Sequence, residues 1–162
     1  MSYNPRWIQM KREYPEYPIP AVSGVVFDSR GRILFVKRKN PPLAGTWSLP
    51  GGAVRLGEEL REALKREIGE ECGIRVEVVS FLSASSRIVP EGKERIHYHF
   101  VLLNYLCTFA EGEAIAGSDA MEVRWVPPDE IDSLGVSEEI LAVIQKASEV
   151  MVKKGRLDKG DS

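Results

Sequence analysis

The chain has 162 residues, of which 43% are hydrophobic and 28% charged, and its formal net charge is −2. This composition is typical of one soluble globular domain with a hydrophobic core, and it excludes a disordered, collagen-like or fibrous chain. Proteins that bind a nucleic-acid backbone usually carry a basic excess. The near balance of 22 Lys and Arg against 24 Asp and Glu therefore argues against DNA as a partner.

The two cysteines and the start of the chain indicate in which cellular compartment the protein is expected. Cys72 and Cys107 stand alone in the sequence, so they indicate neither a disulfide framework nor a zinc cluster. No apolar leader follows Met1, and no apolar run reaches the roughly 20 residues that a membrane span requires. We therefore expect a cytoplasmic protein with no membrane partner.

The first part of the chain reads as an arm followed by two strands. Residues 1–19 are polar and rich in Pro and Tyr, which is typical of an extended N-terminal arm. Alternating apolar residues predict strands at 21–27 and 33–36, joined as a hairpin by the turn at 28–31. A Pro- and Gly-containing loop is expected at 40–45, and we place the main domain at residues 20–152.

The second part of the chain alternates helices with longer strands. A helix is expected over 58–71, ended by Gly73, and β segments follow at about 74–87 and 95–109. An acidic loop at 111–120 leads to a short strand at 122–126, and Ser137 is a candidate N-cap for a last helix. Residues 153–162 form a charged tail. This order predicts a single α+β layered domain.

Carboxylates interrupt the apolar face of the first predicted helix. Leu60, Leu64 and Ile68 form its apolar stripe, and Glu67 and Glu71 fall within the same arc. Burying an ionised carboxylate without a partner is very costly, so these groups must be paired with cations or coordinate a metal ion.

Two interpretations of these carboxylates remain open at this point. Arg61, Lys65 and Arg66 could neutralise them as surface ion pairs, because a charge run is usually a solvated face. Alternatively, Glu67 and Glu71, with Glu70 at the margin of the arc, could present oxygen ligands to a hard divalent cation such as Mg²⁺.

The spacing around this helix resembles the Nudix box of the Nudix hydrolases. The sequence reads Gly52-x5-Glu58-x7-Arg66-Glu67-Ile68-x-Glu70-Glu71-x-Gly73-Ile74 and agrees with the box at every defined position. The resemblance implies a Nudix-type α/β/α sandwich with a mixed sheet. It also implies hydrolysis of a phosphoanhydride in a nucleoside diphosphate derivative, with Mg²⁺ or Mn²⁺ bound.

The resemblance also suggests roles for individual residues. Glu67, Glu70 and Glu71 match the metal-binding glutamates of the family, and the backbone carbonyl of Gly52 is a further expected ligand. The remaining pair of the box, Glu58 and Arg66, is expected to brace it structurally.

The group that accepts a proton from the attacking water is left open by the sequence. Glu70 is the candidate within the box, and Asp119 and Glu122 are candidates on a distant loop and strand. Glu111 and Glu113 are weaker candidates of the same kind. We take Glu67, Glu70 and Glu122 as the expected catalytic set.

Substrate choice depends on residues outside the box. The segments Tyr17-Pro18-Ile19-Pro20 and Ser118-Asp119-Ala120 are similar to ADP-ribose pyrophosphatase-like members, whose products would be AMP and ribose 5-phosphate. Expected contacts are Arg38 with phosphate oxygens, Tyr17 with the adenine, and His97 as polar lining. Further residues were considered as aromatic walls, a loop anchor or polar groups: Trp7, Tyr14, Phe27, Lys37, Lys39, Trp47, Tyr98 and His99.

Two other functions remain alternatives. One is a nucleoside triphosphate pyrophosphohydrolase that removes unwanted nucleotides. The other is a nucleotide-sensing module without catalysis, which the complete set of carboxylates argues against. A small nucleotide is the expected partner in each case, and the Pro- and Tyr-rich arm makes a homodimer a further expectation.

Overall fold

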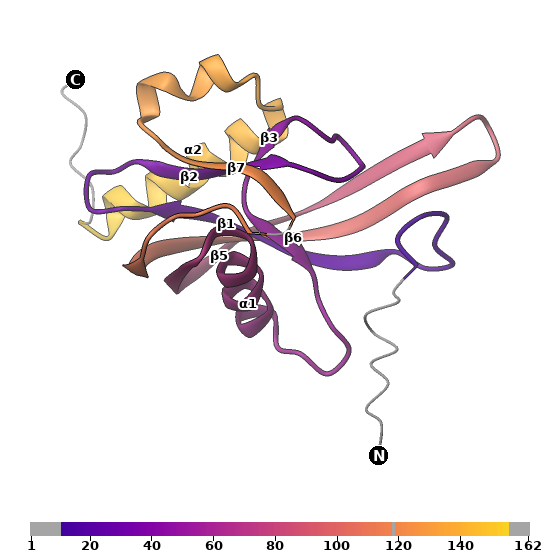
Figure 1. Cartoon of the computed structure of the whole chain (residues 1–162), viewed down its shortest axis with the longest axis horizontal. Coiled ribbons are helices and arrows are strands. Elements are labelled where there is room, and N and C mark those ends of the chain that lie inside the picture. The colour runs from indigo at the N-terminus through magenta and orange to yellow at the C-terminus, as the bar shows by residue number, and fades with distance from the viewer. Residues whose placement is uncertain (1–10, 118, 156–162) are drawn as a thin grey trace.

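The computed structural model describes residues 11–117 and 119–155, which form one layered α+β domain (Figure 1). Trp7 and the end of the predicted tail lie outside the described residues. The elements in chain order are β1 (Ile19–Phe27), β2 (Ile33–Arg38), β3 (Trp47–Ser48), β4 (Gly51–Ala53), α1 (Leu60–Cys72), β5 (Ile74–Glu91), β6 (Arg95–Gly112), β7 (Ala120–Val126), the 3-10 helix η2 (Pro128–Leu134) and α2 (Glu138–Lys153).

The sheet is mixed, and its central pairing is parallel. The strands lie in the order β3-β2-β1-β6-β5, with β4 paired to β1 and β7 paired to β2. β1 runs parallel to β6 from the pair Ile19 and Phe100 to the pair Phe27 and Thr108, and antiparallel to β4. The predicted hairpin of the first two strands is reduced to one registered pair, Phe27 with Ile33, because β2 pairs mainly with β7.

Alternate side chains of the central strands pack into two separate hydrophobic clusters, one on each face of the sheet. Val22, Val26, Leu34 and Val36 belong to a cluster with the apolar stripe of α1. Their neighbours along the same strands belong to a second cluster with α2 and η2: Val25, Phe27, Ile33 and Phe35. Because successive side chains point to opposite faces of a sheet, α1 and α2 cover opposite faces (Figure 1). This arrangement confirms the predicted sandwich.

The local signals of α1 explain where it ends. Gly73 adopts a left-handed conformation with φ 74°, and its N–H donates to the carbonyl of Gly69, which closes the helix one residue later than predicted. The helix begins at Leu60 rather than at Glu58, because Glu58 belongs to the preceding turn. Cys72 and Cys107 are both fully buried in the cluster beneath α1.

The β5–β6 hairpin extends beyond the rest of the sheet. The two strands pair from Ile74 and Gly112 to Glu91 and Arg95, whereas β1 covers only the part of β6 from Phe100 onward. The loop that precedes β1 lies beside the projecting end of this hairpin (Figure 1). None of the described helices is long and apolar enough to cross a membrane.

Candidate active site

Two glycines bring the backbone of β4 against both β1 and α1. Gly51 pairs with Ser23 and Gly52 with Val22 in the antiparallel ladder. A Cβ at Gly51 would collide with the carbonyl of Val22, and a Cβ at Gly52 would collide with the carboxylate of Glu67. The close approach to the backbone of β1 therefore requires glycine at Gly51, and the Gly52 backbone lies directly beside the Glu67 carboxylate.

Arg66 braces this loop against the helix. Its guanidinium donates to both carboxylate oxygens of Glu58, at 2.7 and 2.9 Å, and to the carbonyl of Ala53 at 3.1 Å. A further bond of 2.8 Å reaches Glu67. The bidentate bond to Arg66 holds the pKa of the Glu58 carboxyl below its usual range. The structure thus supports a bracing role for both residues.

Glu67 and Glu71 are carboxylates on the buried side of α1. The side chain of Glu67 is only 14% exposed, and burial raises its pKa despite the contact with Arg66. Burial raises the pKa of Glu71 to about 8, and the nearby charges of Glu67 and Asp119 add to this, against a hydrogen bond from the Gly51 N–H. Desolvated carboxylates of this kind gain when a cation replaces the missing water.

Glu70 points elsewhere. Its side chain is 50% exposed and lies 3.4 Å from the Arg66 guanidinium and 3.7 Å from that of Arg55. Across residues 11–117 and 119–155, no three His, Cys, Asp or Glu side chains converge in a geometry that could hold a metal ion. Glu67 and Glu71 fit the oxygen donor set of a divalent cation. Glu70 would have to rotate away from Arg66 to join them.

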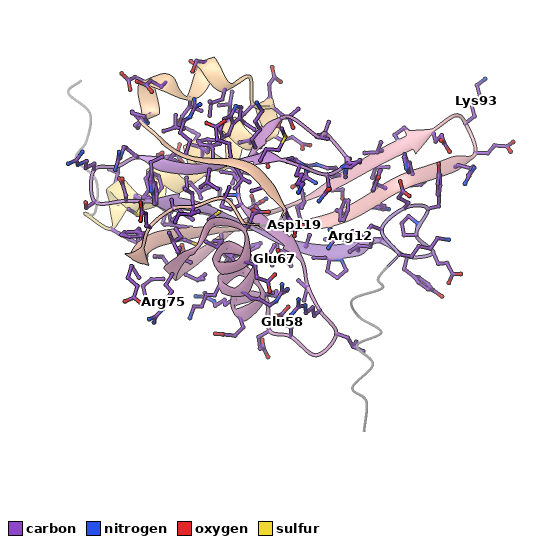
Figure 2. All side chains as sticks on the ribbon, viewed as in Figure 1. Arg12, Glu58, Glu67, Arg75, Lys93 and Asp119 are labelled. Carbon is purple, nitrogen blue, oxygen red and sulfur yellow. The ribbon has the colours of Figure 1, made fainter. Side chains whose placement is uncertain are left out.

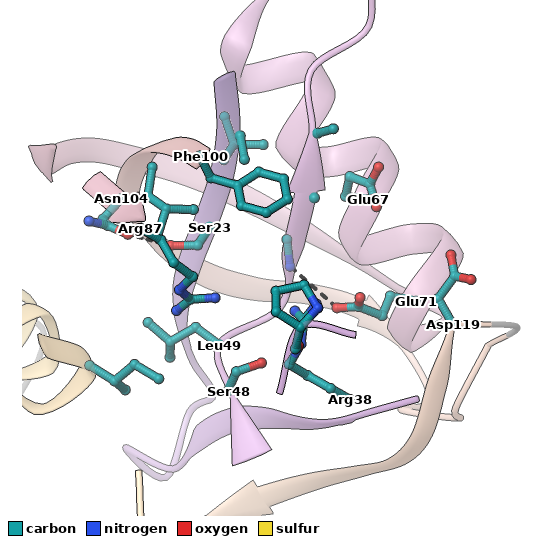
Figure 3. A pocket seen from close by; sticks show the side chains of 18 of the residues that line it. Ser23, Arg38, Ser48, Leu49, Glu67, Glu71, Arg87, Phe100, Asn104 and Asp119 are labelled. Carbon is teal, nitrogen blue, oxygen red and sulfur yellow. Dashed lines mark hydrogen bonds between the residues drawn. The ribbon is translucent and has the colours of Figure 1, made fainter. Parts of the chain in front are cut away.

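A pocket opens between the carboxylates of α1 and the sheet (Figure 3). Glu67, Glu71 and Asp119 lie together on the α1 side, and Arg87 from β5 lies across the pocket from them (Figure 3). The floor comes from β1 and β6, and Leu49, Ile140 and Val143 supply an apolar end toward α2. The pocket therefore has an acidic side, a basic side and an apolar end, as a nucleotide derivative requires.

Some residues predicted from the sequence line this pocket. Gly52, Glu67 and Glu71 do so, and so does Arg38, the residue expected to contact phosphate. Of the two distant candidates for the proton acceptor, Asp119 is in the pocket wall. Glu122 lies on β7, where its carboxylate accepts a hydrogen bond of 2.8 Å from Arg124, and it is not among the lining residues.

Other predicted residues lie outside the pocket lining. Tyr17 is 77% exposed on the loop before β1. His97 stacks on Tyr14 and contacts Glu13 at the projecting end of the hairpin. Among the further candidates, Phe27 and Tyr98 are buried, Trp47 packs against the second core cluster, and Glu111 pairs with Arg75. Lys39, by contrast, does line the pocket.

Sequence reasoning missed several residues of the pocket wall. Arg12 and Arg87 supply positive charge from the loop before β1 and from β5, and Phe100 supplies an aromatic ring from β6. Asn104 is buried in the same wall and accepts a hydrogen bond from the Ser23 hydroxyl. A polar Asn within the apolar run 100–107 is a signal of this wall in the sequence.

The sequence that forms this site and fold matches a known protein family. The family model for the NUDIX domain matches residues 18–146, which span the sheet, α1 and most of α2. The chain belongs to the Nudix family. The glycine pair, the Arg66 brace and the buried glutamates of α1 are its Nudix box in three dimensions.

Relatives of this Nudix chain carry more than one substrate name. An ADP-ribose pyrophosphatase from Methanocaldococcus jannaschii is 34% identical over 134 residues, which are 80% of this chain and 76% of that protein. The 8-oxo-dGDP phosphatase NUDT18 from Mus musculus is 29% identical over 106 residues, 65% of this chain and 31% of that protein. Among solved structures, the MutT NUDIX hydrolase from Burkholderia pseudomallei superposes with a TM-score of 0.68 at 28% identity, covering 81% of this chain and 98% of that one.

Membership in the family establishes the class of reaction. The chain is a hydrolase that cleaves phosphoanhydride bonds in small nucleotide substrates, and Nudix hydrolases generally need divalent metal ions. This is consistent with buried carboxylates beside a pocket that also carries arginines.

Proposed function

We propose that this Nudix enzyme hydrolyses ADP-ribose to AMP and ribose 5-phosphate, with Mg²⁺ as its metal and Mn²⁺ as a substitute. The observation that carries the proposal is the 34% identity with an ADP-ribose pyrophosphatase over most of both chains. A pocket with phosphate-binding charge and an apolar end suits an adenosine diphosphate derivative.

Glu67, Glu70, Glu71 and the carbonyl of Gly52 are the proposed metal ligands. When bound, the metal ion would neutralise diphosphate charge and lower the pKa of a water molecule. The protein contributes the position of these ligands: the Arg66 brace fixes Glu67, and the N–H of Gly51 holds an oxygen of Glu71. Arg38 is the proposed contact for phosphate oxygens.

The proton of the attacking water requires an acceptor at the pocket. Glu70 remains the candidate within the box, although its carboxylate is engaged with Arg66 and Arg55. Asp119 lies in the pocket wall beside Glu71, and Glu122 does not. We therefore favour Asp119 over Glu122 as the alternative acceptor.

Product identification tests the proposed substrate. Purified protein with Mg²⁺ is incubated separately with ADP-ribose, 8-oxo-dGTP, 8-oxo-dGDP and the common nucleoside triphosphates. AMP and ribose 5-phosphate from ADP-ribose, abolished by EDTA and by Glu67→Gln, are the expected products. A preference for the oxidised guanine nucleotides would overturn the ADP-ribose proposal and favour nucleotide-pool cleaning, the function suggested by the weaker likeness to the 8-oxo-dGDP phosphatase.

A sensing module without catalysis makes a different prediction. Such a protein would bind ADP-ribose in a thermal-shift assay and would release no product with any nucleotide of the panel. The buried carboxylates argue against it, because a site that only binds anions gains nothing from Glu67 and Glu71 beside the ligand.

A further inference from the structure

Three arginines from distant parts of the chain line the same pocket. Arg12 belongs to the loop before β1, Arg38 ends β2, and Arg87 lies near the outer end of β5. Arg87 lies across the pocket from the carboxylates of α1, whereas Arg38 lies on the side of Glu71 (Figure 3). The charge of Arg38 acts on Glu71, and that of Arg12 acts on Glu67. Only Arg38 is among the residues that the sequence singled out for substrate contact.

These arginines have few protein partners. Arg38 donates through Nε to the carbonyl of Pro42 at 2.8 Å. The ion pairs found within the described part of the chain include none of the three. Burial lowers the pKa of Arg38, and the charges of Arg87 and Arg12 lower it further, whereas the nearby Glu71 carboxylate raises it. Three guanidinium groups that repel one another around a pocket are stabilised by an anion between them.

Arg12 is an exposed residue of the pocket lining, and the residues that follow it contact the projecting hairpin. The carboxylate of Glu13 accepts a hydrogen bond from the Tyr98 hydroxyl at 3.1 Å and lies 3.2 Å from Nε2 of His97. We call these contacts, together with those of Tyr14 described next, the arm clasp. It fixes the backbone on the C-terminal side of Arg12.

Tyr14 makes the larger share of the arm clasp. Its N–H donates to the carbonyl of His97 at 2.8 Å, its hydroxyl donates to Glu91 at 3.0 Å, and its ring stacks on the His97 ring at 4.7 Å. The guanidinium of Arg95 covers the ring at 3.9 Å. Tyr14 also has φ 48°, a left-handed conformation that a non-glycine residue keeps only where its surroundings impose it.

We propose that Arg12, Arg38 and Arg87 together bind the diphosphate oxygens of the substrate, and that the arm clasp positions Arg12 for this contact. The proposal rests on the proposed function for the identity of the substrate. The anion site itself does not depend on that identity: guanidinium groups from three separate parts of the chain bind two adjacent phosphoryl groups. Arg12, Arg38 and Arg87 are substrate-binding residues, and Tyr14 is a positioning residue that acts through Arg12.

Binding of inorganic pyrophosphate in EDTA tests the anion site without catalysis. Isothermal titration of the full chain at low salt should show binding that weakens as salt is added. Arg87→Gln, Arg38→Gln and Arg12→Gln should each weaken it by about tenfold, because each removes charged hydrogen bonds to phosphate. Wild-type affinity in Arg87→Gln, or no binding by the wild-type chain, would overturn the proposal.

Matched controls separate this site from a general effect of net charge. Arg75→Gln removes the same charge from the same strand, but Arg75 is exposed, pairs with Glu111 and lies far from Arg12 (Figure 2). Lys11→Gln removes an exposed charge next to Arg12. Both control variants should bind pyrophosphate as the wild type does. Equal weakening in Arg75→Gln would overturn the proposal.

The arm clasp is tested by a double-mutant cycle. Tyr14→Ala should weaken pyrophosphate binding as much as Arg12→Gln, and the double variant should bind no more weakly than Arg12→Gln alone. Tyr14→Phe keeps the ring contacts with Arg95 and His97 and should restore most of the affinity. Additive losses in the double variant would show that Tyr14 does not act through Arg12.

Steady-state kinetics with ADP-ribose separate this proposal from the proposed function. The arginine variants should raise KM more than they lower kcat if both proposals hold. If ADP-ribose is not cleaved but pyrophosphate binding depends on Arg87, the anion site stands and the substrate is wrong. If ADP-ribose is cleaved and the arginine variants match the wild type in KM, the substrate stands and the anion site falls.

Discussion

The glutamate side of the pocket and its arginine side are built from opposite kinds of contact. The box is local in sequence: Arg66 reaches Glu58 across 8 positions and Glu67 at the next one. The arm clasp joins residues 77 positions apart in the bond from Tyr14 to Glu91 and 85 apart in the bond from Tyr98 to Glu13. Local geometry can be read from helix periodicity, whereas the second kind of contact exists only once the sheet has formed.

The two sides also differ in burial and in charge. Glu67, Glu71 and Arg66 are mostly buried and partner one another through short bonds or close charges. The carboxylates of the arm clasp are more exposed, with Glu13 62% and Glu91 48% exposed, although Tyr98 in the clasp is buried. We therefore expect variants on the glutamate side to change turnover and stability, and variants on the arginine side to change affinity with little effect on stability.

The largest expected effect is on turnover. Glu67→Gln should lower kcat by about a hundredfold or more, since a proposed metal ligand that supplies several kcal/mol of charge stabilisation is lost. The fold should be retained, because an uncharged amide costs less to bury than a carboxylate. Initial rates with Mg²⁺ measure this. Glu62→Gln, an exposed change on the same helix, is the control, and full activity of Glu67→Gln would refute the metal assignment.

Addition of Mg²⁺ should raise the free energy of unfolding of the protein. A cation in about hundredfold excess over its Kd raises the free energy of unfolding by about 2.7 kcal/mol, which for a domain of this size corresponds to several degrees in Tm. Thermal unfolding with Mg²⁺ and with EDTA measures the shift. The shift should be absent from Glu67→Gln and unchanged in Arg87→Gln, because the proposed cation ligands all lie on the glutamate side. Equal shifts in all three proteins would contradict this division.

Loss of the brace should have a smaller effect on stability. Arg66→Lys keeps one charge but removes the bidentate bond to Glu58 and the bond to Ala53, and we expect a loss of about 2 kcal/mol in the free energy of unfolding. Urea denaturation measures it. Lys65→Ala, an exposed neighbour, should lose well under half of this. A loss in Arg66→Lys no larger than in Lys65→Ala would show that the brace contributes little.

The smallest effect belongs to the arm clasp. Tyr14→Phe removes an exposed hydrogen bond to Glu91 and should change the free energy of unfolding by about 0.5 kcal/mol or less. The same urea experiment measures it. A loss as large as that of Arg66→Lys would mean that the clasp supports the fold itself, and the contrast between the two sides would fail.

The same division explains how much could be predicted. The helix, its end at Gly73 and the position of Glu67 and Glu71 on its buried face followed from periodicity, because these depend on neighbours in sequence. The sandwich was implied only by the resemblance to the Nudix box. The parallel pairing of β1 with β6 could not be predicted, because it joins residues far apart in the sequence. For the same reason, the pocket wall that contains Asn104 and Arg87 could not be predicted. The positions of Tyr17 and His97 relative to the pocket depend on the same long-range pairing.

Local reasoning was also limited within the box itself. The box pattern places Glu67, Glu70 and Glu71 in one ligand set, although the helical arc already puts Glu70 at its margin. In the folded chain the turn of α1 directs Glu67 and Glu71 toward the glycine pair, and Glu70 toward Arg66 and Arg55. Helix geometry sets the direction in which each carboxylate leaves α1, and the ion pairs with Arg66 and Arg55, which spacing alone does not predict, then hold Glu70 away from the other two glutamates.

The burial of Cys72 and Cys107 allows their reactivity to report how often α1 separates from the sheet. Burial raises the pKa of both thiols, and both lie in the cluster between α1 and the sheet, so a thiol reagent reaches them only when this layer separates. The rate of alkylation therefore reports how often α1 leaves the sheet. A substrate or cation that bridges α1 to the opposite wall should slow that rate, which makes the two thiols native reporters of ligand binding without an added label.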